Sequence, residues 1–216
     1  MKIMVHFGDK TSFVAPHSLK NKLNTLNNQP LIFQHQIHSN KGLALTEQNI
    51  EQYKHCLTHN SDYLITAIKN IWIGALTADC LPIALMDEKH NAIGIVHAGW
   101  RGTIGKIAVN TLNHMRKLYG TKPEEVKISL GPCALPCCYE IDQPFIDNLP
   151  EWAKQSVYNN TFDLPACNIH QLIESGVKKE YINRSHNQCT ICNDNFCSHR
   201  KNPMSRARQM SIISLR

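Results

Sequence analysis

Apolar residues fall in short runs separated by polar turns along most of this chain, a pattern that favours strands over long helices. Six runs have the length and composition of buried strands, over residues 62–68, 71–78, 81–86, 92–96, 126–130 and 210–215. A partly alternating run over 31–38 predicts a further strand that ends near His38. Residues 1–30 are polar and predict one short strand among loops.

The hydrophobic period changes after Gly102. Apolar residues then recur at helical spacing and predict a helix over 104–118, with Gly120 in the place of a C-cap. A second helix is predicted over 165–174 and closed by Gly176. Because strands outnumber helices and do not alternate regularly with them, we predict an α+β fold of mixed β-sheets with flanking helices. The length of 216 residues suits a single domain over 1–216.

The runs over 81–86 and 92–96 are separated by the polar turn at 87–91 and predict a hairpin. Pro82 has no N–H to give to a sheet ladder, so it predicts a strand edge, a bulge or a loop beside Cys80.

Composition limits the expected location of the protein, the state of its cysteines and its possible partners. No apolar run approaches the ~20 residues that span a bilayer, and the first residues lack a secretory signal, so a cytoplasmic location is expected. Nine cysteines, an odd number, favour reduced thiols and metal ligation over a disulfide framework. The net charge of +6 comes entirely from residues 178–216, which suits an anionic small molecule, nucleic acid, or simply a solvated surface.

Three candidate metal ligands lie at predicted strand ends or just after them, namely His38, Cys80 and His97. If the fold brings them together, they form a set of two histidines and one cysteine with an open fourth position, which is typical of catalytic zinc. Bound zinc lowers the pKa of water to about 7 and so supplies a nucleophile. Each residue alone is more often structural, and Cys80 as a nucleophile with His97 as its base would give a cysteine hydrolase instead.

A second candidate feature is Arg101-Gly102-Thr103, which leads into the predicted helix and could hold phosphate through a guanidinium and the helix start. The alternative is that Thr103 caps the helix and Arg101 points to solvent.

The loop over 131–140 combines a glycine and two prolines with Cys137, Cys138, Tyr139 and Glu140, which suits a rigid pocket wall. Because Cys137 and Cys138 are adjacent, we expect them to pack or line a pocket rather than chelate one ion together.

Four residues near the C-terminus have the spacing of a small structural zinc site, namely Cys189, Cys192, Cys197 and His199. These four residues are an alternative to His38, Cys80 and His97 as the metal site.

Four ordered motifs in the sequence resemble the YfiH family, also described as the DUF152 or polyphenol-oxidase-like laccase-domain family. They are Gln36-Ile37-His38-Ser39, Thr77-Ala78-Asp79-Cys80-Leu81-Pro82-Ile83, His97-Ala98-Gly99-Trp100-Arg101-Gly102, and Gly131-Pro132-Cys133 through Cys137-Cys138-Tyr139-Glu140. Weaker matches are Cys189-Thr190, Phe196-x-Ser198-x-Arg200 and Arg208-Gln209. The resemblance covers about residues 31–215.

The resemblance implies an α+β fold related to a cysteine-hydrolase-like toxin domain, and zinc ligands at His38, Cys80 and His97. It implies phosphorolysis of purine nucleosides (adenosine, inosine or methylthioadenosine), with adenosine deaminase as a second activity. The expected partners are therefore a purine nucleoside and phosphate, and the expected cofactor is Zn²⁺, with copper as the weaker alternative.

Within that interpretation, particular residues take particular roles. Arg101, Gly102, Thr103, Gln36 and Cys138 are the candidate substrate and phosphate residues. Asp79 or Glu140 would assist proton transfer to the leaving base.

Three other functions stay open. The family is also associated with editing of peptidoglycan or its precursors, and with copper-dependent phenol oxidation, although one set with two histidines lacks the ligands of a multicopper site. A non-enzymatic zinc-stabilised module could bind nucleic acid through residues 178–216, but only Tyr181 and Phe196 offer stacking there.

Departures from the family pattern concern the N-terminal stretch and the pocket. The segment before Gln36 is short, and Gly8-Asp9 and Asn21 are what it keeps of the family's pattern. Leu135, His199 and Ala207 stand where other residues are usual in the family. We therefore predict an altered nucleoside preference rather than a loss of zinc binding.

Overall fold

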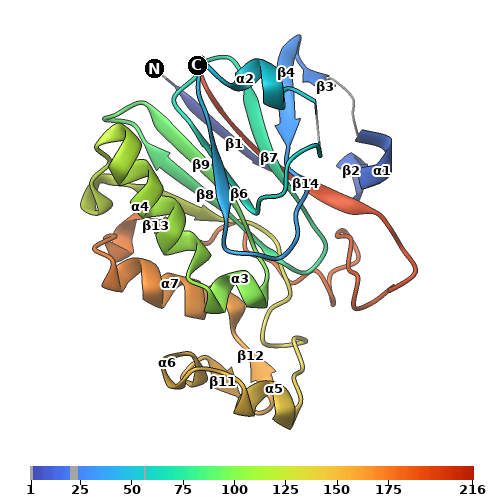
Figure 1. Cartoon of the computed structure of the whole chain (residues 1–216). Helices are drawn as coiled ribbons and strands as arrows, with labels where there is room; N and C mark the ends of the chain where they lie inside the picture. Colours follow the sequence, from blue (N-terminus) through green and yellow to red (C-terminus); the bar gives the residue numbers. More distant parts are fainter. Residues whose placement is uncertain (1, 20–23, 56) are drawn as a thin grey trace.

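The computed structural model describes residues 2–19, 24–55 and 57–216, and Asn21 lies outside them (Figure 1). Two mixed sheets stack on each other, and the two longest helices cover the outer face of the second sheet. This arrangement confirms the predicted α+β class with mixed sheets and flanking helices. None of the helices formed by the described residues is long and apolar enough to cross a membrane.

The first sheet has the strand order β1-β14-β7-β4-β3, with β2 paired to β14. β4 and β7 are parallel and the other pairs are antiparallel. Its strands are β1 (Ile3–Phe7), β2 (Phe13–Val14), β3 (Asn24–Leu26), β4 (Gln29–Phe33), β7 (Trp72–Thr77) and β14 (Arg208–Leu215). The N-terminal thirty residues thus contribute more strands than their polarity predicted, because pairing with buried strands supplies the apolar contacts that those residues lack.

The second sheet has the order β13-β10-β8-β9-β6-β5, with parallel pairs at its two edges. Its strands are β5 (Gly42–Leu45), β6 (Tyr63–Thr66), β8 (Leu81–Asp87), β9 (Ala92–Ala98), β10 (Lys127–Leu130) and β13 (Ile182–Asn183). The predicted β8–β9 hairpin is confirmed. Pro82, however, lies within central strand β8 rather than at a sheet edge, and it is tolerated because the ladder with β10 begins only at Ile83.

The predicted helix over 104–118 is in fact two helices, α3 (Trp100–Ile104) and α4 (Ile107–Tyr119). The break comes at Lys106, which adopts a left-handed conformation with φ 58°. Gly120 ends α4 in the left-handed region, as predicted, and α7 (Leu164–Glu174) matches the second predicted helix. The remaining helices and strands are short, namely α1 (Pro16–Leu19), α2 (Ile50–Tyr53), α5 (Gln143–Asp147), α6 (Glu151–Lys154), β11 (Val157–Tyr158) and β12 (Thr161–Phe162).

The core is divided by the second sheet. One cluster lies between this sheet and helices α4 and α7, and includes Ile83, Leu112 and Leu172. Another lies between the two sheets, where Ile73 and Ile95 are fully buried. Strand β9 is covered on both faces, which explains why its sequence is a continuous apolar run instead of an alternation of apolar and polar residues.

Two of the connections that cross from the first sheet to the second lie at the same end of the molecule. One joins β4 to β5 and carries His38, and the other joins β7 to β8 and carries Cys80. Strand β9 ends there as well, immediately before α3, with His97 as its penultimate residue. The stacking of the sheets therefore brings three segments that are distant in sequence to one place.

Candidate metal centre and its cavity

The structure brings His38, Cys80 and His97 together. Each offers one ligand atom, and the three atoms lie within 4.8 Å of one another. The two imidazole rings meet edge to face with centroids 4.8 Å apart. His97 is buried and His38 is exposed, so the group lies between the core and the surface. His38 follows a strand that ends at Phe33 rather than near His38, and its left-handed backbone (φ 60°) turns it toward the other two.

Asp62 organises two of these three residues, and sequence reasoning did not identify it as a site residue. Its fully buried carboxylate accepts a hydrogen bond from His97 Nδ1 at 2.9 Å and from the His38 backbone N–H at 3.0 Å. The Ser39 N–H and hydroxyl also donate to it, at 2.6 and 2.7 Å. Because Nδ1 of His97 is the donor, its Nε2 is left free as a ligand, which is the usual arrangement at metal sites. The only sequence signal was an acid placed directly before an apolar strand.

Electrostatics favour the anionic form of Cys80. Burial by itself raises the pKa of the thiol, but the charge and hydrogen bonds of His97 and His38 lower this pKa to about 6. For His97, burial by itself lowers the pKa, but Cys80 and Asp62 raise this pKa overall, to above its ordinary value. A thiolate is the form of cysteine that binds a metal ion, so the pair suits metal binding as well as nucleophilic chemistry.

Gly99 leaves room for this centre. A Cβ at that position would lie 3.0 Å from Cys80 Sγ and 3.1 Å from His38 Cδ2, which is too close for an undisturbed side chain. The Ala-Gly step between His97 and Trp100 is thus required by the close approach of the backbone to the sulfur and the imidazole.

We expect Asp62→Asn to weaken zinc binding at this centre by about 10- to 100-fold, because an amide no longer fixes the His97 tautomer. Competition with a chromophoric chelator measures the affinity. Asp87→Asn is the matched control, since Asp87 is also buried and accepts from a histidine, His90 Nδ1, at 2.9 Å in a different part of the chain. Equal zinc affinities in the two variants would refute the role given to Asp62.

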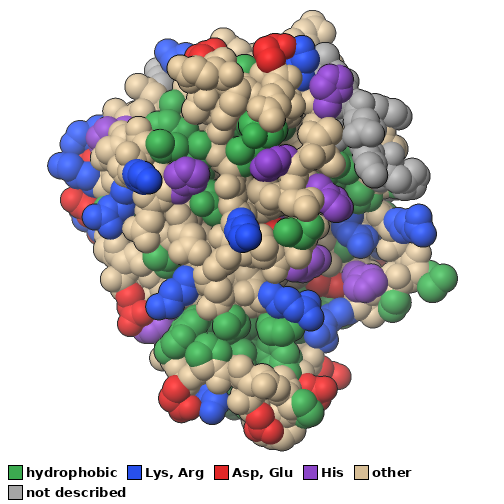
Figure 2. Space-filling view, viewed as in Figure 1, with side chains coloured by type: hydrophobic (Ala, Val, Ile, Leu, Met, Phe, Trp, Pro, Cys, Tyr) green, Lys and Arg blue, Asp and Glu red, His purple; other side chains and the backbone are tan. Residues whose placement is uncertain are grey.

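The centre opens on a cavity of about 500 Å³, a size that suits a small-molecule ligand. The lining includes the three candidate ligands together with Trp100, Tyr139, His199, Arg200 and Arg208. Figure 2 shows one face of the molecule, on which basic and histidine side chains spread across the middle while most acidic side chains lie toward the edges. Arg200 and Arg208 belong to the basic C-terminal region, so part of the predicted positive charge faces this cavity.

Two predicted site residues line the cavity, but their polar side-chain groups form hydrogen bonds with other parts of the protein. Asp79 accepts from Thr190 Oγ1 and from the Arg200 N–H, both at 2.7 Å, and so fixes the C-terminal loop beside Cys80. Its backbone is left-handed, with φ 88°, a strained conformation for an aspartate. The amide of Gln36 donates to the Leu76 carbonyl and accepts from the Leu76 N–H, both at 2.7 Å. Both side chains therefore position their neighbours.

The structure places the predicted phosphate cradle at 101–103 differently from the expectation, and its role in binding phosphate stays a prediction. These residues lie inside the five-residue helix α3 instead of preceding a helix, and none of them lines the cavity. Thr103 is fully buried, where its hydroxyl accepts from Asn168 Nδ2 at 2.9 Å, and Gly102 is buried as well. Arg101 is exposed with its guanidinium 4.4 Å from the Trp100 ring centre.

The loop over 131–140 contributes Tyr139 to the cavity wall and not the two residues predicted from it. Glu140 is exposed outside the cavity, and its carbonyl accepts from Arg200 Nη1 at 2.8 Å. Cys138 also lies outside the cavity lining. Tyr139 is buried, and burial is the main reason that its pKa is raised.

The predicted C-terminal zinc site is also corrected. Cys189 and Cys192 group with Cys137 and Cys138, whereas Cys197 and His199 are outside the candidate metal groups of the described residues. His199 lines the cavity, and Cys197 lies beside β14, where its N–H donates to Gln209.

The comparison with known families covers the whole chain. The family model described as multi-copper polyphenol oxidoreductase laccase matches residues 1–216. The chain belongs to this laccase-domain family. The resemblance to the YfiH or DUF152 group is thereby confirmed, and the crystal structure of the Bacillus licheniformis hypothetical protein YfiH agrees with it. That structure has a TM-score of 0.81 and 25% identity, covering 99% of this chain and 93% of the other.

Two curated relatives of this laccase-domain protein carry the name purine nucleoside phosphorylase. YlmD of Geobacillus stearothermophilus is 33% identical over 169 residues, which are 72% of this chain and 60% of that protein. LACC1 of Homo sapiens is 29% identical over 191 residues, which are 78% of this chain and 44% of the human protein. The alignments thus span less than two thirds of either relative.

Proposed function

We propose that this laccase-domain protein cleaves purine nucleosides with phosphate, in a reaction that depends on a metal ion at His38, Cys80 and His97. The observation that carries the proposal is the position of this metal-ligand set on the wall of a cavity that two arginines also line. The names of the curated relatives supply the substrate class.

Zinc fits the donor set best. Two imidazoles and a thiolate are ligands that zinc prefers, and three protein ligands leave a position for substrate or water. When bound there, the ion would supply Lewis-acid polarisation of an oxygen in phosphate or water. Among the chain's own residues, Asp62 keeps His97 in the ligating tautomer and Gly99 keeps the approach open.

Arg200 and Arg208 are the proposed phosphate residues, in place of Arg101. Nη1 of Arg200 donates to the Glu140 carbonyl, and this guanidinium also contacts Tyr139, while Nη1 of Arg208 donates to the Ser205 and Ala207 carbonyls. The remaining N–H groups of each guanidinium are available to bind an anion. Trp100 and Tyr139 provide aromatic walls for the purine base.

In phosphorolysis, an oxygen of hydrogen phosphate bonds to C1′ of the ribose while the bond from C1′ to the base nitrogen breaks, and the proton given up by the phosphate is the one that the departing base takes up. The arginines would hold phosphate and offset its charge. Asp79 holds Thr190 through one carboxylate oxygen and the Arg200 backbone through the other. Deamination of adenosine, with water in place of phosphate, would be a second reaction in the same cavity.

The test is a chromatographic assay of purified, metal-analysed protein with inosine and adenosine, with and without phosphate. We expect free base and ribose 1-phosphate only when phosphate is present, inosine as a side product from adenosine, and no turnover in His97→Ala. His90→Ala is the matched control, because His90 also pairs with a buried aspartate but lies away from the cavity. Base release that persists in His97→Ala would refute the proposal.

A second candidate is copper-dependent phenol oxidation, which the family description favours. Two histidines and a cysteine also suit a single copper ion that transfers electrons. Within the described residues, however, this set is the one candidate metal group that contains histidine, which is too few for a multicopper centre. Oxidation of a phenol by copper-loaded protein, without nucleoside turnover by zinc-loaded protein, would establish this alternative.

A further inference from the structure

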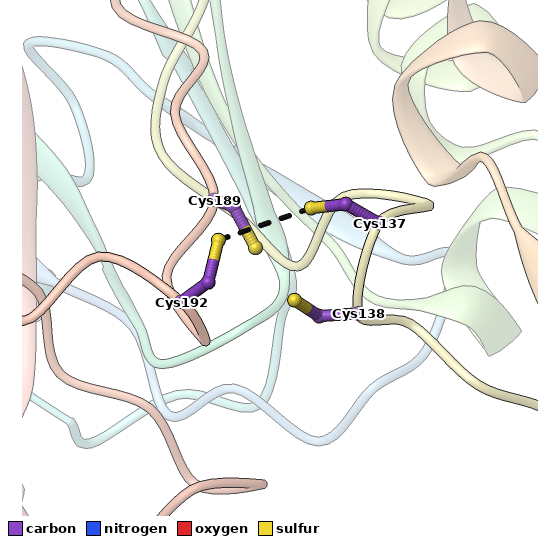
Figure 3. A group of neighbouring side chains, drawn as sticks. All are labelled: Cys137, Cys138, Cys189 and Cys192. Atoms are coloured by element: carbon purple, nitrogen blue, oxygen red, sulfur yellow. Dashed lines mark hydrogen bonds between the residues drawn. The ribbon is translucent and has the colours of Figure 1, made fainter.

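Four cysteines outside the cavity form a second cluster. Cys137 and Cys138 come from the loop between β10 and α5, and Cys189 and Cys192 from the segment that follows β13. Their sulfur atoms lie within 4.8 Å of one another, and Figure 3 shows the four side chains pointing toward a common centre. We expected Cys137 and Cys138 not to converge on one ion, and the structure shows that their sulfurs do converge.

Local backbone bonds explain how adjacent cysteines reach the same point. The N–H groups of Cys138 and Tyr139 both donate to the Leu135 carbonyl, at 2.9 and 2.8 Å, which folds the loop into a tight turn. Next to this turn, Cys133 makes two backbone hydrogen bonds with the facing segment. Its N–H donates to the Gln188 carbonyl at 3.1 Å, and its carbonyl accepts from the Thr190 N–H at 2.9 Å. The two cysteine pairs are thereby held facing each other.

One sulfur pair of the cluster has the spacing that a tetrahedral ion requires, and all four sulfurs lie within 4.8 Å of one another. Zinc binds thiolates at about 2.3 Å, which places neighbouring sulfurs of a tetrahedron about 3.8 Å apart. The Cys137 and Cys192 sulfurs are 3.9 Å apart. A disulfide requires about 2.05 Å, and all four cysteines are free thiols.

The protein also prepares one sulfur of the cluster as an acceptor. Burial raises the pKa of the Cys189 thiol, but the backbone N–H groups of Cys192, Leu135 and Ile191 near its sulfur lower this pKa below its ordinary value. Amides directed at a sulfur stabilise its thiolate, and such donors commonly surround metal-bound cysteines. Cys189 is buried, while Cys137 and Cys192 are exposed, so an ion can enter from the surface.

We propose that Cys137, Cys138, Cys189 and Cys192 bind a second zinc ion in a closed, structural site with four thiolate ligands. Four protein ligands fill the tetrahedral shell, so this ion takes no part in the chemistry of the cavity. It fastens the loop of Tyr139 to the C-terminal segment of Thr190 and Arg200. Tyr139 and Arg200 meet at the cavity, where the Arg200 guanidinium carbon lies 4.3 Å from the Tyr139 ring centre. The proposal is independent of the reaction that the cavity performs.

Metal analysis of the purified, reduced full-length protein tests the site. We expect about two zinc ions per chain in the wild type and about one in Cys192→Ser. His97→Ala should also lose one ion, but from the other centre. Cys197→Ser is the control that loses a thiol without losing an ion, because Cys197 lies outside the cluster. If the cavity centre holds no zinc, the wild type has one ion and Cys192→Ser has none, so the two proposals fail separately.

Cobalt substitution keeps the test decisive if Cys192→Ser does not fold. In wild-type and in His97→Ala protein, Co²⁺ should give a strong thiolate-to-metal charge-transfer band and the visible bands of a tetrahedral ion. Chelation of zinc from His97→Ala protein, whose cavity centre should be empty, should also make four thiols newly reactive with a thiol reagent. Equal zinc contents of wild type and Cys192→Ser, absence of the cobalt band in His97→Ala, or a native disulfide within the cluster would each overturn the proposal.

Discussion

Cys80→Ser is expected to lower the rate of nucleoside phosphorolysis by roughly a thousandfold, the loss of several kcal/mol of charge stabilisation that a bound metal ion supplies. A serine hydroxyl does not ionise near neutral pH, so it cannot replace the thiolate whose pKa His97 and His38 lower. Initial rates with inosine and phosphate, measured beside the zinc content of the same sample, check the result. Activity and the zinc of this centre should be lost together.

Chelation separates this prediction from the alternative in which Cys80 is a nucleophile. Both hypotheses predict an inactive Cys80→Ser. The hypothesis of a metal ion at Cys80 predicts that a chelator inactivates Cys192→Ser, which lacks the second zinc site, as well as the wild type, and that added zinc restores both, because a nucleophilic cysteine needs no ion. Cys197→Ser, which removes a thiol outside both metal groups, should retain activity and control for general effects of losing a cysteine. A chelated wild type at full activity would argue for the cysteine nucleophile.

The sequence predicted best those features that depend on local pattern. The hairpin of β8 and β9, the strand β14 and the helix α7 follow from runs of apolar residues and were placed nearly within their bounds. The ligand set was reached by chemistry, since imidazole and thiolate groups at strand ends are unusual, and by resemblance to a family. The predicted relation to a cysteine-hydrolase-like toxin fold stays a prediction.

Features that depend on the meeting of distant segments could not be predicted from pattern. Asp62 acts through contacts with residues 23 to 35 positions away, and nothing in its own neighbourhood distinguishes it from a capping acid. The cysteine cluster joins residues 55 positions apart, and the spacing of Cys189 and Cys192 fitted an incorrect local partner set equally well. The break at Lys106 has one local signal, Gly105, which is the C-cap of α3, but the apolar periodicity continues across it and favoured a single helix.

The arginines that line the cavity could not be identified from local sequence pattern either. Charge counting located the positive excess at 178–216, and the motif match included Arg200 and Arg208, but the helix after Gly102 drew the phosphate assignment to Arg101. In the structure Arg101 packs on Trp100 outside the cavity, while Arg200 and Arg208 line it. Variants of these three arginines therefore test the assignment directly.

Replacing both Arg200 and Arg208 by alanine is expected to lower kcat/KM for phosphate by about 10²- to 10³-fold, the effect of removing preorganised donors to a developing or bound anion. Zinc content should stay at the wild-type level, because neither arginine contacts a candidate ligand among the described residues. Lysine at both positions should recover only part of the loss, since an ammonium supplies charge without the planar fork. Arg101→Ala is the matched control and should leave KM for phosphate unchanged. If instead Arg101→Ala raises that KM and the double variant does not, phosphate binds at the start of α3, and the cavity arginines serve only to hold Glu140, Ser205 and Ala207 in place.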